Sequence, residues 1–255
     1  MTSIGFLVAA VFLPLFPLSM LFNRLFARLE NAWLRMVLLL LWPQLGVLTL
    51  VMLGEKPDTW LVWWAVATSA LYALRTLALR DLRLWTGYMA TSAWSLLLPA
   101  AAFAPHAANV DTLVLQAAGF SAPFILLTWI SGRLDTEFGA AYAGVCGGLS
   151  GTVPRLSGLL TLAVLAAVAT PMVPGFFILL ATTLHALPVM PGSALIILTV
   201  WLLWAWSGVR ILRGFIVGTD RGGPVRDLGN AATTFLGLTF VVLMLAGIQM
   251  SGDLR

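Results

Sequence analysis

Charge is scarce in this sequence. Charged residues make up 9% of the 255 residues, whereas 60% are hydrophobic, and a soluble domain has about a quarter of its residues charged. This composition excludes a water-soluble fold. The net charge of +4 could point to nucleic acid, but the arginines lie in short loops between apolar blocks, where they determine membrane topology. We therefore expect a membrane protein that binds no nucleic acid.

Residues that build metal and redox sites are also few. Cys146 is the only cysteine, so this chain alone forms no intrachain disulfide and no cysteine-based zinc or iron–sulfur site. Asp135 and Glu137 pair two carboxylates beside Arg133, with no histidine near them in the sequence, which favours a solvated ion-pair cluster over a catalytic or metal site. We expect no cofactor, no metal and no catalytic residue.

The apolar residues fall in blocks of about twenty, the length of a helix that crosses a hydrocarbon core of about 30 Å. The sequence therefore predicts an all-α polytopic membrane protein of about eight transmembrane helices. We expect the spans at residues 4–22, 36–53, 60–79, 84–104, 112–131, 156–169, 193–209 and 228–248. They form a single transmembrane domain over 1–255, with an N-terminal four-helix part (1–111), a middle part (112–227), and a last helix and tail (228–255).

Proline and glycine interrupt the region between the sixth and seventh spans. The broken segment 170–192 contains a short apolar stretch among Pro171, Pro174, Gly175, Pro188 and Pro191. Proline lacks a backbone N–H and breaks a regular helix. A segment that re-enters the membrane and returns to the same side keeps eight spans, whereas a full crossing makes nine.

The arginines predict the orientation, because basic residues accumulate in cytoplasmic loops. The first, third and fifth loops hold Arg24, Arg28, Arg35, Arg75, Arg80, Arg83, Arg133 and Arg155, while the second and fourth hold only Lys56. We expect an integral protein of the bacterial inner (cytoplasmic) membrane with its N-terminus outside. The last cluster, Arg210, Arg213, Arg221 and Arg226, joins the other arginines only if the broken segment returns to its starting side.

Few polar residues lie where a membrane protein could use them for transport. An ionisable group deep in a bilayer costs several kcal/mol and often marks an ion path. Arg75 and Arg210 lie about one turn inside their helix ends, where a long side chain reaches the headgroups. His185 follows Thr182 and Thr183 in the broken segment and could relay protons, although a structural histidine is the stronger interpretation.

Two patterns concern the surfaces of the predicted helices. Trp201, Trp204 and Trp206 are typical of interfacial belts, so we expect them to contact lipid. The small residues Ala117, Ala118, Gly119, Ser121 and Ala122 would let another helix approach closely.

The order of short motifs between residues 115 and 218 resembles a known family. The motif residues are Gln116, Ala117, Phe120, Ser121 and Ala122; Gly147-Gly148-Leu149 with Pro154; Ala169-Thr170-Pro171; Pro174-Gly175-Phe176; and the arginine-rich ending 210–218. This order resembles the C-terminal part of the antiporter-like subunits of proton-pumping NADH:quinone oxidoreductase (complex I). Related chains occur in membrane-bound hydrogenases, multisubunit cation/proton antiporters and DAB-type inorganic-carbon uptake complexes. The resemblance implies a full crossing by the broken segment.

The departures from the family concern its proton path. Members of the family carry buried Lys, His and Glu residues in consecutive helices, and they are longer than this chain, so we expect their N-terminal helix repeat to be shortened or absent here. In this sequence Ala117 stands at the histidine position, Ser121 at the lysine position, and Leu179 near the Lys or Glu position after Gly-Phe. The resemblance therefore implies a family member without the proton-carrying axis.

These observations favour an accessory or reduced antiporter-like subunit of a multisubunit, ion-coupled, energy-converting complex. We expect it to brace a larger proton-conducting antiporter-like chain rather than to pump protons or catalyse a reaction alone. The alternative is a small stand-alone transporter or channel for a neutral or weakly charged solute, with its site at the broken segment. A membrane enzyme acting on lipid or quinone would need a site shared with a partner.

Overall fold

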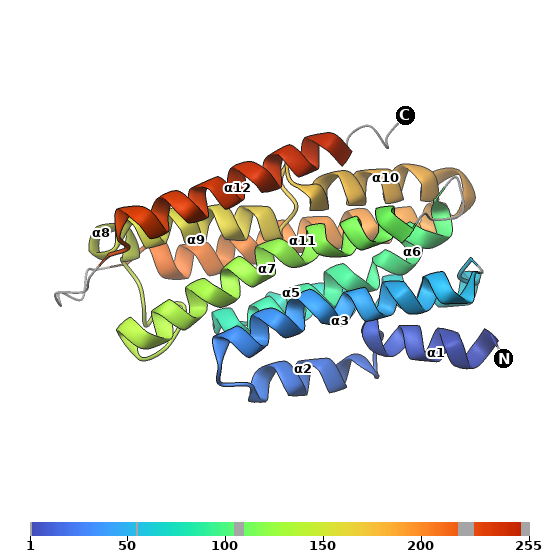
Figure 1. Ribbon diagram of the computed structural model, residues 1–255, viewed down its shortest axis with the longest axis horizontal. Helices are drawn as coiled ribbons and strands as arrows, with labels where there is room; N and C mark the ends of the chain where they lie inside the picture. The colour runs from blue at the N-terminus through green and yellow to red at the C-terminus, as the bar shows by residue number, and fades with distance from the viewer. Residues whose placement is uncertain (1, 55, 105–109, 219–226, 251–255) are drawn as a thin grey trace.

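The computed structural model describes residues 2–54, 56–104, 110–218 and 227–250, and most of them are helical. The helices are α1 (Thr2–Phe12), α2 (Ser19–Arg28), α3 (Ala32–Leu53), α4 (Thr59–Thr76), α5 (Leu82–Ser95), α6 (Leu97–Phe103), α7 (Val110–Phe138), α8 (Leu149–Thr152), α9 (Pro154–Ala167), α10 (Pro174–Val189), α11 (Pro191–Ile216) and α12 (Asn230–Met250). They run along one long axis of the molecule (Figure 1). The all-α class predicted from the sequence is confirmed.

Length and hydropathy single out four helices of the described chain as able to cross a membrane, namely α3, α7, α11 and α12. Two shorter apolar helices, α9 and α10, contain 14 and 16 residues. A count of spans therefore depends on how the shorter helices combine.

The shorter helices follow one another in pairs that lie end to end in Figure 1: α1 with α2, α5 with α6, and α9 with α10. The expectation of one continuous helix at 4–22 is wrong. The structure has two helices there, with a break between Phe12 and Ser19. Pro14 and Pro17 lie in that break, and neither can donate a backbone hydrogen bond to continue a helix. Each pair is about as long as one of the long helices.

The break between α9 and α10 lies partway along the bundle, with Ala169 and Val173 buried and Met172 54% exposed. Ala169 (φ 57°) and Met172 (φ 83°) adopt left-handed backbone conformations, which are uncommon for residues other than glycine. Pro174 then begins α10 at a position where its missing N–H costs no helical hydrogen bond. Beyond the break the chain continues along the same direction, and it turns back only at Met190, where α11 begins (Figure 1).

Helix α7 forms the centre of the bundle and packs on α3, α5, α9 and α10. In its most apolar window 61% of the residues are buried, against 22% in α12, which lies at the edge. The sequence explains the difference, because α7 carries small residues such as Ala117 and Gly119 on its buried side. Large apolar side chains such as Phe235 and Val242 point outward from α12.

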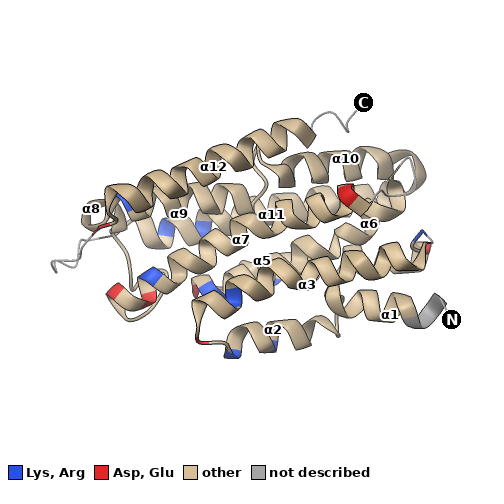
Figure 2. Ribbon diagram, in the orientation of Figure 1, with Lys and Arg blue, Asp and Glu red and all other residues tan. Residues whose placement is uncertain are grey.

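The described arginines gather at one end of the molecule (Figure 2). At this end α2, α4, α7 and α11 finish, and α3, α5 and α9 begin (Figure 1). We call it the arginine-rich end. Lys56, the only lysine of the sequence, lies between α3 and α4 at the opposite end (Figure 2). Arg221 and Arg226 lie outside the described residues, so the placement of the last cluster rests on Arg210 and Arg213.

Candidate functional site

A pair of buried serines joins α4 to α5 in the interior. The hydroxyls of Ser69 and Ser92 each donate to the backbone carbonyl of the other residue at 2.8 Å, and the two Oγ atoms are 3.1 Å apart. Both side chains are fully buried. Because a polar group in a lipid-surrounded interior must find its partner within the protein, this reciprocal arrangement satisfies both hydroxyls locally.

Two indoles extend this contact to further helices. The indole N–H of Trp204, on α11, donates to Ser92 Oγ at 2.9 Å, and that of Trp94, on α5, donates to Ser121 Oγ on α7 at 3.2 Å. We call Ser69, Ser92, Trp94, Ser121 and Trp204 the hydroxyl–indole layer. It connects α4, α5, α7 and α11 in the middle of the bundle.

The expectation that Trp204 contacts lipid is wrong. Its side chain is fully buried, whereas Trp206 is 59% exposed. Residues two positions apart in the sequence point about 200° apart around an α-helix. Trp204 and Trp206 therefore cannot lie on the same face. This spacing was the available signal in the sequence.

The hydroxyl–indole layer holds no group that ionises near neutral pH. Ser121 stands where the family resemblance places a lysine, and Ala117, where it places a histidine, is fully buried. Of the buried polar side chains in the described part of the chain, only Arg35 is charged. It lies in the first turn of α3, at the arginine-rich end, and its Nη2 donates to the Glu30 carbonyl at 3.4 Å.

The candidate residues of the broken segment are not part of this layer. Thr182 and Thr183 donate to the carbonyls of Ile178 and Leu179 on their own helix, each at 2.7 Å. His185 is partly buried near the end of α10, and its imidazole makes no hydrogen bond to any described residue. The three residues are neighbours on one helix and do not form a relay with the serines of α4 and α5.

Protein atoms pack closely against the buried side of the α9–α10 break. The indole N–H of Trp201 donates to the Ala169 carbonyl at 3.2 Å. A Cβ atom at Gly119 of α7 would lie 2.7 Å from Pro174, and one at Gly247 of α12 would lie 2.3 Å from the Met172 carbonyl oxygen. Gly119 of α7 therefore admits the start of α10 of this same chain.

The two arginines singled out in the sequence lie at the arginine-rich end. The Arg75 guanidinium lies 5.8 Å from the centre of the Tyr72 ring, a cation–π distance. Arg210 lines an open cavity together with Arg80 and Arg213. Both Arg75 and Arg210 are exposed, as side chains that reach toward headgroups would be.

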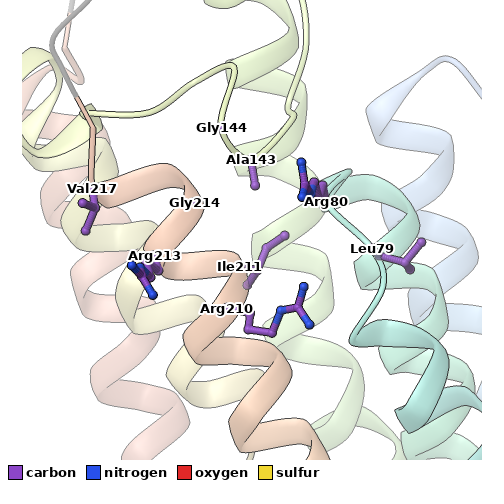
Figure 3. Close-up of a pocket in the computed structure, with 9 residues that line it drawn as sticks. All are labelled: Leu79, Arg80, Ala143, Gly144, Arg210, Ile211, Arg213, Gly214 and Val217. Atoms are coloured by element: carbon purple, nitrogen blue, oxygen red, sulfur yellow. The ribbon is translucent and has the colours of Figure 1, made fainter.

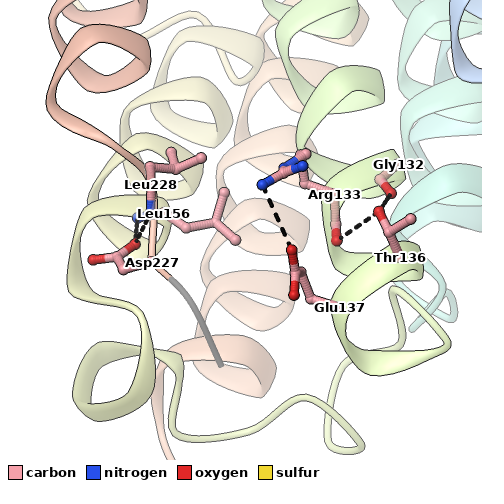
Figure 4. Close-up of polar contacts among 7 residues, drawn as sticks. All are labelled: Gly132, Arg133, Thr136, Glu137, Leu156, Asp227 and Leu228. Atoms are coloured by element: carbon pink, nitrogen blue, oxygen red, sulfur yellow. Dashed lines mark hydrogen bonds and ion pairs between the residues drawn. The ribbon is translucent and has the colours of Figure 1, made fainter. Parts of the chain in front are cut away.

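Acidic residues at this end have structural contacts (Figure 4). Arg133 and Glu137 form the predicted ion pair at 3.5 Å. Asp135 is not part of this ion pair, and its Oδ1 accepts from the Ala141 N–H at 2.8 Å. Asp227 accepts from the N–H groups at the start of α9, including that of Leu156 at 3.2 Å. No three His, Cys, Asp or Glu residues of the described chain lie close enough together to hold a metal ion.

No protein-family model and no curated protein matches the sequence. Solved structures do match. A chain in respiratory complex I from Thermus thermophilus aligns with a TM-score of 0.77 at 21% identity, over 96% of this chain and 54% of that one. A chain of the Mrp complex from Dietzia sp. DQ12-45-1b gives 0.84 at 16% identity, over 99% and 58%. A chain of an archaeal membrane-bound sulfane sulfur reductase gives 0.81 at 16% identity, over 96% and 52%.

This chain shares their fold. The resemblance to antiporter-like subunits, inferred from short motifs, is thus confirmed at the level of the fold. The chain spans just over half the length of each of these structural relatives.

Proposed function

We propose that this protein is an accessory, antiporter-like membrane subunit of a multisubunit, ion-coupled, energy-converting complex. It would pack against a larger proton-conducting chain, and seal or brace that chain without moving protons itself. Two observations support the proposal. The fold is that of chains found in complex I, the Mrp complex and the sulfane sulfur reductase complex, and the interior of this chain has a different chemistry from a proton path.

The hydroxyl–indole layer carries the proposal. A proton moves across a bilayer through closely spaced protonatable groups or through water, because a charge in hydrocarbon costs several kcal/mol. Serine hydroxyls and indole N–H groups do not exchange charge near neutral pH. In this layer Ser92 and Ser69 are held in mutual hydrogen bonds, which favours a packing role over conduction.

The lengths of the helices and their end-to-end pairing lead us to propose eight crossings of the membrane. They are α1 with α2, α3, α4, α5 with α6, α7, α9 with α10, α11, and α12. The 30 helical residues of α9 and α10 (14 and 16) give about 45 Å of helix, enough for one crossing. Counting the two as one crossing places Arg210 and Arg213 on the side of the earlier arginines, which we propose is the cytoplasm.

Cysteine labelling in membrane vesicles tests this topology. Cys146 is the only cysteine and is buried, so C146S provides a background without thiols. On that background we expect K56C to react with a membrane-impermeant maleimide only from outside and R133C only from the cytoplasmic side. Labelling of both positions from one side would reject the proposed crossings.

Extraction and reconstitution test the proposed role. Mild detergent should extract the chain within a larger membrane assembly. The purified chain alone in liposomes should not dissipate an imposed pH gradient faster than empty liposomes do. A stable isolated monomer, or a specific and saturable proton flux through the chain alone, would reject the accessory role.

The rival proposal, a stand-alone transporter for a neutral solute, needs space for a substrate at the α9–α10 break. Gly119 and Gly247 bring α7 and α12 within van der Waals contact of this break, so the packing does not favour it. Uptake of a neutral solute by liposomes that contain only this protein would revive it.

A further inference from the structure

A basic cavity opens at the arginine-rich end. Its volume is about 350 Å³, within the range of small-ligand sites. Arg210 and Arg213 from the last turns of α11 line it, together with Arg80 from the connection between α4 and α5 (Figure 3). This cavity lies apart from the hydroxyl–indole layer and has no part in the proposed accessory role.

Backbone contacts fix the walls of the cavity. The Ala143 N–H donates to the Arg80 carbonyl and the Gly144 N–H donates to the Gly214 carbonyl, both at 2.8 Å. A Cβ atom at Gly214 would lie 2.6 Å from that of Ala143, so the loop after α7 sits directly on α11. The segments that carry the three arginines are thus held together by backbone hydrogen bonds through the loop after α7. The fold therefore sets the distances between the backbone positions of the three arginines.

No acidic residue of the described chain pairs with the charges in the cavity. None of the three guanidinium groups forms an ion pair or a hydrogen bond with another residue of the described chain, and no acidic side chain among the described residues lines the cavity. Three like charges around one opening repel each other. A guanidinium binds phosphate oxygens through paired N–H donors, so a phosphate group would relieve this repulsion.

An apolar stripe leads from the membrane to the cavity. Leu202 and Trp206 precede Arg210 by two turns and one turn on the same face of α11, and they are 68% and 59% exposed. On the adjoining helix α4, Leu74 is 54% exposed. A molecule with a phosphate head and hydrocarbon tails would contact both the arginines and the stripe.

We infer that this cavity binds the headgroup of an anionic phospholipid, with the acyl chains lying along Leu202 and Trp206. Basic pockets between helices at the cytoplasmic face suit such headgroups, because that leaflet carries the anionic lipid. A free phosphate ion would use the arginines but not the stripe. The two sources of phosphate can therefore be separated by experiment.

Native mass spectrometry of the full chain, purified in detergent and freed of lipid, tests the inference. Phosphatidylglycerol and phosphatidylcholine with identical acyl chains are added separately. We expect the protein to retain phosphatidylglycerol preferentially, and R210Q/R213Q to lose this preference by at least about tenfold, since each basic residue near an anionic surface contributes roughly fivefold.

The matched control is R24Q/R28Q, which removes the same charge from exposed arginines of α2 at the same end and should retain the wild-type preference. Gel filtration confirms that each variant is folded, and R80Q is a second, independent variant of the cavity. Equal retention of the two lipids by the wild-type chain, or an unchanged preference in R210Q/R213Q, would overturn the inference. Complete displacement of phosphatidylglycerol by excess inorganic phosphate would overturn the assignment to lipid.

Discussion

Replacing Gly247 by alanine tests how α12 packs on the α9–α10 break. The added Cβ would lie 2.3 Å from the Met172 carbonyl oxygen and 2.8 Å from the Val173 carbonyl carbon. Both are backbone atoms, so the clash cannot be relieved by a side-chain rotation. Overpacking of this kind costs about 1–3 kcal/mol. For a chain of this size that corresponds to a fall in melting temperature of roughly 3–10 °C.

The same helix provides the control. A Cβ at Gly237 would meet no atom within 4 Å, so G237A should be neutral or stabilise the helix by up to about 1 kcal/mol. Thermal unfolding followed by circular dichroism, in one detergent and at one protein concentration, gives the comparison. If G247A melted at the same temperature as G237A, α12 would not pack on the break as described.

Three further experiments test the interior. W204F removes the indole donor to Ser92, and we expect a loss of about 1 kcal/mol in the free energy of unfolding, with no loss in the exposed control W206F; equal effects in thermal melts would contradict the burial of Trp204. A double-mutant cycle with S69A and S92A should give a coupling of about 0.6–1.7 kcal/mol, and an additive result would mean that the serine pair is not formed. H185A should leave both the melting temperature and the activity of the assembled complex unchanged, because the His185 imidazole has no hydrogen bond to a described residue; a loss of activity would assign it a functional role.

The sequence could predict the class of the fold because apolar blocks of membrane-spanning length leave few alternatives. The breaks were harder to place. Pro171 and Pro174 indicated the break after α9. Pro14 and Pro17 gave the same signal for the break before α2, but they lie within an otherwise apolar block that suggests one continuous helix. Whether a broken segment turns back or continues depends on neighbours such as Gly247, which is distant in sequence from the break.

The interior contacts could be predicted only in part. Helical spacing separates Trp204 from Trp206 and so indicates that one of them is buried. The partner of Trp204 is a serine on α5, 112 residues earlier in the chain, and no local pattern reveals such a pairing. Serine is common on helix surfaces as well as in contacts between helices, so Ser92 and Ser69 carried no distinctive signal.

The interruption between α9 and α10 has an electrostatic consequence. A helix carries a partial negative charge of about half an elementary charge at its C-terminus and an equal positive one at its N-terminus. Because the two helices lie end to end, the negative end of α9 faces the positive end of α10 (Figure 1). The opposite poles largely cancel. The gap can therefore persist in a hydrocarbon surrounding without a counterion, and no charged side chain of the described chain is buried beside it.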